Sequence, residues 1–356
     1  MFLCLCVGLA SAQLLLGGKA GGMGGAGVAN VTDMSAVYYN PASFIHDDVK
    51  IAKAQVSLGA AYSDPTALQN AISNATDAAT FIVDNYGNNL DFNGSLDGVV
   101  GLNIKGIGIS VLPAATVTVD KNANTLIGSV NTNIQYATTL TAGKSFTVSY
   151  LPAALDVGLN LKSISAIKGS IATTGNPTET TGTKYYSTGT GTGIDIGALT
   201  SFDVPLVTGF KVGAVIRNLA QTITYSNTSQ ASTLKYYVTG TTEVVTGAET
   251  DLPDTTETAG RAYVIGASAV IPSIGLTVAG DIERASGDIN THLGVEYPIA
   301  ARAVLLRAGL ASGANLSKTS IGAKLNLPFF IFDIVTIADN NNAGLTSYIF
   351  DLGFGF

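Results

Sequence analysis

Residues 21–44 read GGMGGAGVANVTDMSAVYYNPASF, and the interpretation of the chain starts from them. Five of the first seven are glycine, too many for a helix, and the apolar residues do not alternate as they would in a strand. Asn30, Asp33 and Asn40 can hydrogen-bond their own main chain in tight turns. The valines and aromatic residues between them favour burial. We therefore predict irregular chain lodged inside a larger structure, with a flexible glycine-rich leader as the alternative.

The composition of the 356 residues indicates a membrane protein. Mean hydropathy is +0.35 and 12 % of residues are charged, against about 25 % in soluble domains. No apolar run after the first 16 residues reaches the roughly 20 that a membrane helix needs. A closed β-barrel remains, because it pairs every backbone group within the protein. The net charge of −7, without a basic patch, argues against nucleic acid as a partner.

The start of the chain, MFLCLCVGLASAQ, resembles a secretory signal with a small-residue cleavage site at Ala10-Ser11-Ala12. We assign 1–12 to a signal peptide, 13–48 to an N-terminal plug segment and 49–356 to the barrel. A short buried strand is the alternative for the first residues. Cys4 and Cys6 fall in the predicted signal, so the mature protein would have no cysteine, no disulfide and no Cys-ligated metal.

Alternation of apolar and polar residues predicts an all-β fold, a transmembrane antiparallel β-barrel of about 14 strands. One short helix is predicted at 65–86, after the first strand, because apolar residues recur there at helical spacing. Two polar, Thr-rich stretches, 173–193 and 227–258, are predicted as long outer loops, and the turns near Asn122 and Asp203–Thr208 as periplasmic. The predicted strands are 50–63, 95–105, 106–121, 129–142, 155–172, 184–203, 209–226, 259–272, 274–285, 289–299, 302–312, 316–327, 329–339 and 345–356.

The last predicted strand has one apolar face, and the final residue of the sequence, Phe356, belongs to that face. A terminal Phe after such alternation resembles the C-terminal signal that the barrel insertion machinery reads, so this machinery is a predicted partner. A core strand of a soluble sandwich would explain the alternation, but not the terminal Phe, the low charge and the leader together. The residues of this face are Tyr348, Phe350, Leu352, Phe354 and Phe356.

If the apolar faces point to lipid, a set of charged residues points into the lumen. Both signs occur, so these residues can pair across the lumen and hold a plug. A polar substrate or ion path is the other interpretation. The set comprises Asp156, Lys162, Asp195, Lys211, Arg217, Asp281, Glu283, Glu296, Arg307, Lys324 and Asp351.

The sequence predicts no catalytic, cofactor or metal site, and therefore no enzyme. Asp281 and Glu283 would face the same way, but no nucleophile lies near them, and arginines nearby can neutralise them. His46 and His292 are the only histidines and have no His or Cys neighbour. The GMGGAG run at 22–27 does not follow a strand in a βαβ unit, so nucleotide binding is rejected.

The stretch 21–44 resembles the N-terminal segment of the FadL-like superfamily, the long-chain fatty-acid transporters of outer membranes. There a G-x-G-G-A-G-x-A run leads through an acidic turn to a Tyr-x-Asn-Pro-Ala element. The resemblance implies a plug inside a fourteen-stranded barrel. The matching residues are Gly24, Gly25, Ala26, Gly27, Ala29, Asp33, Ala36, Tyr39, Asn40, Pro41 and Ala42, and the predicted plug or gating residues are Gly24, Gly25, Gly27, Asp33, Tyr38, Tyr39, Asn40 and Pro41.

The C-terminal half is more similar to the TraF-like conjugal-transfer relatives, through 211–223 and 276–297. We expect a monomer in the outer membrane of a diderm bacterium that passively transports small hydrophobic, fatty-acid-like molecules. Its expected partners are membrane lipid and a hydrophobic ligand or detergent. The alternatives are a non-transporting structural or secretion barrel, TraF-like or PorV-like, and a general diffusion porin.

Overall fold

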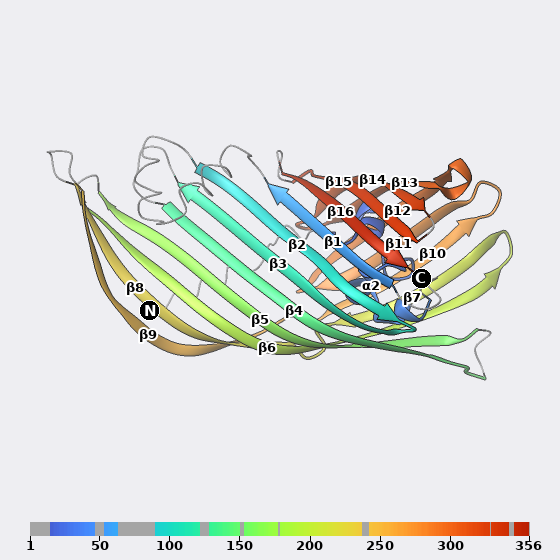
Figure 1. Ribbon diagram of the computed structural model, residues 1–356, viewed down its shortest axis with the longest axis horizontal. Coiled ribbons are helices and arrows are strands. Elements are labelled where there is room, and N and C mark those ends of the chain that lie inside the picture. Colours follow the sequence, from blue (N-terminus) through green and yellow to red (C-terminus); the bar gives the residue numbers. More distant parts are fainter. Residues whose placement is uncertain are drawn as a thin grey trace.

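The computed structural model is a β-barrel whose strands are much longer on one side than on the other (Figure 1). It describes residues 15–46, 53–62, 90–121, 128–149, 153–176, 179–236, 242–327, 329–341 and 345–355. The predicted signal at 1–12 and the predicted helix at 65–86 lie outside these ranges. Among the described residues, no helix is long and apolar enough to cross a membrane. The helical segments are α1 (Gly18–Gly22), α2 (Ala36–Tyr39) and the 3-10 turns η1 (Pro41–His46) and η2 (Ala300–Arg302).

Most consecutive strands pair antiparallel with each other. The strands are β1 (Lys53–Tyr62), β2 (Leu90–Ile104), β3 (Ile107–Lys121), β4 (Gly128–Phe146), β5 (Leu155–Asn176), β6 (Glu179–Val204), β7 (Val207–Arg217), β8 (Thr222–Tyr236), β9 (Thr242–Thr258), β10 (Ala262–Ile271), β11 (Leu276–Ala285), β12 (Asp288–Ile299), β13 (Val304–Gly313), β14 (Ser317–Leu327), β15 (Phe330–Asp339) and β16 (Thr346–Gly355). Within the described residues, β7 does not pair with β8, and β9 does not pair with β10.

Fourteen of the described strands, β1 to β7 and β10 to β16, close a ring. The ring closes because β1 pairs with β16 on one side and with β2 on the other. The prediction of an all-β barrel of about 14 strands is thereby confirmed. Strand β8 continues the line of β7 along β6 after a break at 218–221, and β9 continues the line of β10 after a break at 259–261.

The side chains of the ring alternate between lipid and lumen. In β5, Asp156 and Asn160 are buried, whereas Leu159 and Leu161 are exposed. In β16, Phe350 is 48 % exposed. Large apolar side chains exposed along whole strands are what a lipid-facing surface requires. The terminal Phe356 lies outside the described residues, so its role in insertion stays a prediction.

The prediction of long outer loops at 173–193 and 227–258 is wrong, because the described parts of both stretches are strands. Thr favours strands, and each stretch pairs with a neighbour over its described length. The prediction that the turns near Asn122 and Asp203–Thr208 share one side is wrong as well, although Asn122 itself lies outside the described residues. Strand β3 runs parallel to β5, so it ends at the same end of the barrel as the β5–β6 hairpin. The turn at Asp203–Thr208 lies at the opposite end.

We call residues 163–176, 179–192, 222–236 and 242–258 the arm, which extends the wall beyond the ring (Figure 1). Glycines on β6 leave room there for side chains of β5 and β8. Gly191 pairs with Ile164 on one side and Ile223 on the other. In the next row, Tyr225 lies over Gly189, and a Cβ on that glycine would come within 2.6 Å of the ring. These side chains form a small apolar core within the arm.

We expect Tyr225→Ala to loosen the arm without opening the ring. Tyr225 is 2 % exposed, and truncating a buried aromatic residue costs about 3–5 kcal/mol. The readout is hydrogen exchange of the amides in 222–258, compared with those of β11 to β15. Tyr186→Ala, at a 39 % exposed tyrosine of β6, is the matched control. Equal protection of 222–258 in Tyr225→Ala and the parent would contradict the assigned core.

Candidate functional site

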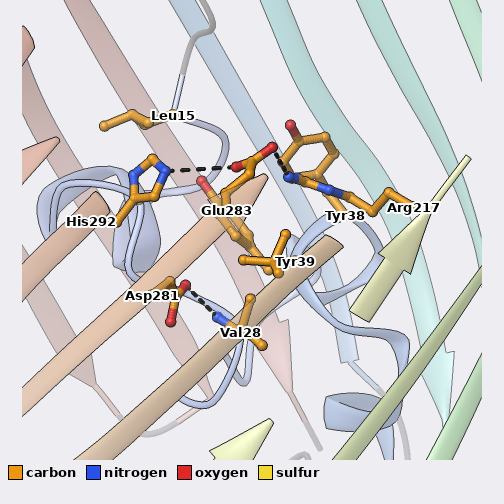
Figure 2. A pocket seen from close by; sticks show the side chains of 10 residues that line it. Leu15, Val28, Tyr38, Tyr39, Arg217, Asp281, Glu283 and His292 are labelled. Carbon is orange, nitrogen blue, oxygen red and sulfur yellow. Dashed lines mark hydrogen bonds and ion pairs between the residues drawn. The ribbon is translucent and has the colours of Figure 1, made fainter. Parts of the chain in front are cut away.

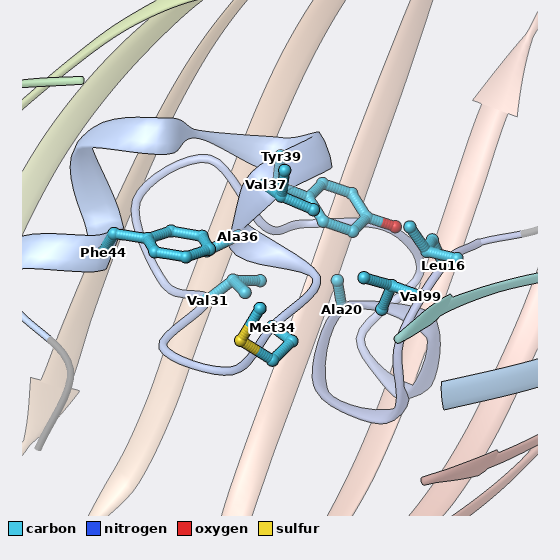
Figure 3. Packing of buried hydrophobic residues seen from close by; sticks show 9 residues of the cluster. All are labelled: Leu16, Ala20, Val31, Met34, Ala36, Val37, Tyr39, Phe44 and Val99. Atoms are coloured by element: carbon cyan, nitrogen blue, oxygen red, sulfur yellow. The ribbon is translucent and has the colours of Figure 1, made fainter. Parts of the chain in front are cut away.

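The plug segment lies inside the ring, against inward-facing residues of the wall (Figure 3). Nearly all side chains of 15–45 are buried, in agreement with the predicted plug. Its apolar residues pack on one another and on Val99 of β2, and this is why the segment holds together without regular structure. The cluster comprises Leu16, Ala20, Val31, Met34, Ala36, Val37, Tyr39, Phe44 and Val99.

Wall carboxylates accept hydrogen bonds from the plug backbone. The N–H groups of Gly27 and Val28 both donate to Oδ2 of Asp281, at 2.7 and 2.9 Å. The N–H of Gly18 donates to Oδ2 of Asp351 at 2.6 Å. Hydrogen bonds to an ionised acceptor are stronger than neutral ones. Two of the predicted lumen charges therefore anchor the plug directly.

Asn40 ties the plug to itself and to the wall. Its Nδ2 donates to Val28 O at 2.9 Å and to Ala198 O of β6 at 3.0 Å, while its Oδ1 accepts from Ala42 N at 3.0 Å. The side chain is fully buried. Pro41 follows directly, and its backbone lies so close to Gly158 of β5 that a Cβ on that glycine would collide with it.

Glycines of the plug allow its close approach to the wall. Gly24 has φ +69°, and a Cβ there would collide with the backbone of Leu310. Gly25 has φ +88°, with Nδ1 of His292 2.6 Å from the place of a Cβ. Both need the left-handed conformation that other residues rarely adopt. Gly27 lies against the ring of Tyr39.

The other two predicted plug residues have different surroundings. Asp33 accepts hydrogen bonds from the N–H (2.9 Å) and hydroxyl of Ser35, so it stabilises the turn before α2. Tyr38 packs edge to face on Tyr39, with ring centroids 5.1 Å apart. The guanidinium of Arg217 lies 4.4 Å from the centre of the Tyr38 ring, a cation–π contact between wall and plug.

The predicted lumen charges form separate groups on the wall. Lys162 pairs with Asp195 at 2.7 Å, and Arg217 with Glu283 at 2.5 Å. The third group is centred on Arg307, whose Nε donates to Glu296 at 2.7 Å and whose Nη1 bonds Asp333. Asp156 is buried on the lumen side of β5, and Lys211 and Lys324 are half-buried.

The plug adds a cation to the third group. The pKa of the Lys19 ammonium of α1 is lowered because the side chain is buried, and the nearby carboxylate of Glu296 offsets part of this shift. Arg307 also lies beside Gly22, where a Cβ would meet its side chain at 3.1 Å. The charges of this group thus serve the contact between α1 and the wall.

A small pocket lies where the plug meets β11 and β12 (Figure 2). Its lining includes Tyr38, Arg217, Glu283 and His292, and it has room for about one water molecule. Nδ1 of His292 lies 2.8 Å from Gly24 O, and its Nε2 lies 3.6 Å from Glu283. Through its contact with Gly24 O, His292 links the wall to the plug at this pocket.

No family model and no curated protein matches the sequence. Solved structures do match. The Pseudomonas putida toluene transporter TodX aligns with a TM-score of 0.63 at 10 % identity, over 96 % of this chain and 99 % of TodX. The Ralstonia pickettii toluene transporter TbuX aligns with a TM-score of 0.58 at 12 % identity, over 96 % and 98 %. The chain has the fold of these toluene transporters.

The barrel fold that the resemblance of 21–44 implied is thereby confirmed. The finer similarity to TraF-like relatives stays a prediction, as do the individual roles of the plug residues. The wall of the barrel accommodates its plug with glycine as well as with charge. A Cβ on Gly294 or Gly309 would collide with Met23 or Gly24 of the plug.

Several wall residues that contribute to holding the plug were missed from the sequence. Gln55 accepts from Met34 N at 3.1 Å, and Asn160 donates to Val37 O at 2.6 Å. Ser268 donates to Ala29 O at 3.0 Å, and Asp333 bonds Arg307. The signal was available, because each is a polar residue at an inward position of an alternating strand. The predicted lumen set contains charged residues only, and Asp333 is not among them.

Proposed function

We propose that this FadL-like barrel lets small hydrophobic molecules cross the outer membrane passively, as a monomer and without a chemical step. The fold that it shares with two toluene transporters supports this. An outward-facing apolar surface around the ring fits a bacterial outer membrane. No cofactor and no energy source is part of the proposal.

The filled lumen is the observation that carries the proposal. The plug is buried; its backbone is bonded to β11 and β16, and the side chain of Asn40 is bonded to β6. Next to it the pocket has room for about one water molecule. Among the described residues, the plug and the wall around it are closely packed, which disfavours a general diffusion porin. A hydrophobic solute can leave sideways, through the wall into lipid.

The breaks at 218–221 and 259–261 are the proposed exit. They interrupt neighbouring strands at the same height, one residue beyond Arg217, which stacks on Tyr38 of the plug. Side chains replace part of the strand ladder here: Asn218 N donates to Asp195 Oδ1 at 2.8 Å. A wall joined by fewer backbone pairs separates at lower cost, and this break lies beside the plug.

A barrel without transport is the second candidate, and the small size of the pocket favours it. Such a protein would serve as a structural or secretion-associated part of the membrane. Both candidates share the fold and the plug, so they differ in one property: whether the plug has to move for a function.

Locking the plug distinguishes the two candidates. Ala26 and Ala279 are buried in one cluster, so Ala26→Cys/Ala279→Cys is designed to cross-link plug and β11. Cys4 and Cys6 would be replaced by Ser in every variant. In vesicles that contain the purified barrel, we expect the oxidised variant to take up labelled toluene no faster than empty vesicles, and reduction to restore uptake.

The single variant Ala26→Cys, oxidised in parallel, is the matched control and should transport like the parent. Labelled glucose should not enter with any variant. If the parent itself takes up no toluene or longer-chain fatty acid above empty vesicles, transport of hydrophobic molecules is wrong and the structural role stands.

A further inference from the structure

The short turns at the end opposite the arm present apolar side chains to the outside. Leu206, in the turn between β6 and β7, is 93 % exposed, and Phe329, between β14 and β15, is 69 % exposed. Ile274, between β10 and β11, is 52 % exposed. Turn tips are normally polar or glycine. We call these three residues the turn tips.

The conformation of two turn tips makes their residue type unusual. Leu206 has φ +74° and Phe329 has φ +65°, and each follows a proline. Gly or Asn is the usual residue at such a position, because a bulky side chain in the left-handed region is strained. Two turns of the same end thus keep a large apolar residue where glycine would cost less.

The apolar band of the wall reaches these turns. Ile107, the first residue of β3, directly follows the turn between β2 and β3 and is 61 % exposed. Leu327, the last residue of β14, is 45 % exposed. Phe354, close to the end of β16, packs on Phe330 with ring centroids 5.3 Å apart. The apolar side chains at Ile107 and around Phe329 therefore adjoin the lipid-facing surface of the wall.

Cations lie at the same edge. Lys105 and Arg302 occupy exposed turn positions, and Lys144 is exposed near the end of β4, with its ammonium 5.6 Å from the centre of the Phe146 ring. The turn of Lys105 lies against β4, because Gly143 N donates to Gly106 O at 2.9 Å. Lys105 and Lys144 are thus neighbours at the edge of the apolar band that lies opposite the arm.

We propose that this end of the barrel binds anionic phospholipid of the periplasmic leaflet. Short turns of outer-membrane barrels face the periplasm. The turn tips enter the boundary between headgroups and acyl chains, and Lys105 and Lys144 hold a lipid phosphate. Continuity with the lipid-facing band favours a lipid over a periplasmic protein. Basic residues next to an apolar surface favour an anionic headgroup.

The first experiment measures lipid preference at the lysines. The chain contains no tryptophan, so Ile107→Trp places a single fluorophore beside Lys105. The full barrel is reconstituted in phosphatidylcholine vesicles that carry equal fractions of brominated phosphatidylcholine or brominated phosphatidylglycerol. We expect phosphatidylglycerol to be enriched at the reporter roughly fivefold, an effect that high salt removes.

Lys105→Gln/Lys144→Gln in the same reporter background should abolish the preference. Lys184→Gln/Arg284→Gln, at two exposed cations of the opposite end, is the matched control and should preserve it. Equal quenching by the two brominated lipids with both lysines intact would overturn the headgroup part of the proposal.

The second experiment locates a turn tip. Phe329→Trp should be quenched by brominated phosphatidylcholine, whereas Tyr186→Trp on the arm should emit as in water and remain unquenched. Quenching of Phe329→Trp no stronger than that of Tyr186→Trp would place the turn tips in water and overturn the proposal. Before quenching is measured, heat-modifiable migration in gel electrophoresis verifies that both variants are folded.

Discussion

Gly24→Leu is expected to produce a conducting barrel, whereas the parent is expected to be nearly closed. A side chain at Gly24 meets the backbone of Leu310 and Leu293, which cannot yield as a flexible side chain can, and the left-handed φ adds strain. Overpacking and strain each cost about 1–3 kcal/mol, so together they raise the displaced population of the plug by about thirtyfold or more. The measurement is single-channel conductance in a planar bilayer.

Gly287→Leu is the matched control for Gly24→Leu. Gly287 also has a left-handed backbone, φ +96°, but a Cβ there meets nothing within 4 Å. Conductance of Gly287→Leu should equal that of the parent. Asn40→Ala should fall between the two, because it loses the contacts to Val28 and Ala198 without a clash. Closed channels in Gly24→Leu, with a correctly folded barrel, would mean that the plug does not seal the lumen.

Arg307→Ala is expected to be the most destabilising single change in the wall. The side chain of Arg307 is 1 % exposed, and it bonds two carboxylates: Glu296 of the neighbouring strand β12, and Asp333 of β15, which lies beyond β14. Removing the cation leaves both carboxylates buried without their partner, at a cost of about 3–5 kcal/mol. The measurement is the midpoint of denaturant unfolding of the barrel in vesicles.

Neutralising both carboxylates should recover most of the loss. The variant Arg307→Met/Glu296→Gln/Asp333→Asn removes charge and partner together, which is often nearly neutral. Glu257→Gln, which breaks the exposed pair with Lys168 (2.5 Å), is the control and should change stability by less than about 1 kcal/mol. A loss as small in Arg307→Ala as in Glu257→Gln would contradict the assigned network.

The ring was predictable from the sequence because its strands have two different environments. In β7, for example, Val215 and Arg217 face the lumen, and Ala214 and Ile216 face outward. This alternation fixes both the number of strands and the face of each residue. The plug was predictable for the opposite reason, since glycine-rich chain with several apolar residues has no regular element to form.

The arm and the contacts of the plug were not predictable by the same argument. Strands of the arm are rich in Thr and Gly on both faces, so they lack the apolar period and read as loops; only the pairing of β6 with β5 and β8 makes them strands. Contacts of the plug depend on which residues the folded barrel brings together. Nothing in the sequence shows that Asp281 meets two N–H groups of the plug while Glu283, two residues on, pairs with Arg217.

The hydrogen bond from Gly18 to Asp351 has a consequence for the order of assembly. It joins residues 333 positions apart, and Asp351 lies on the strand that closes the ring against β1. Until that strand is in place, the carboxylate that receives the start of the plug is absent, and closing so long a loop of chain offers no compensating contact. The plug precedes every strand of the barrel in the sequence, yet it settles last. A plug in its final position therefore requires that the barrel around it is complete.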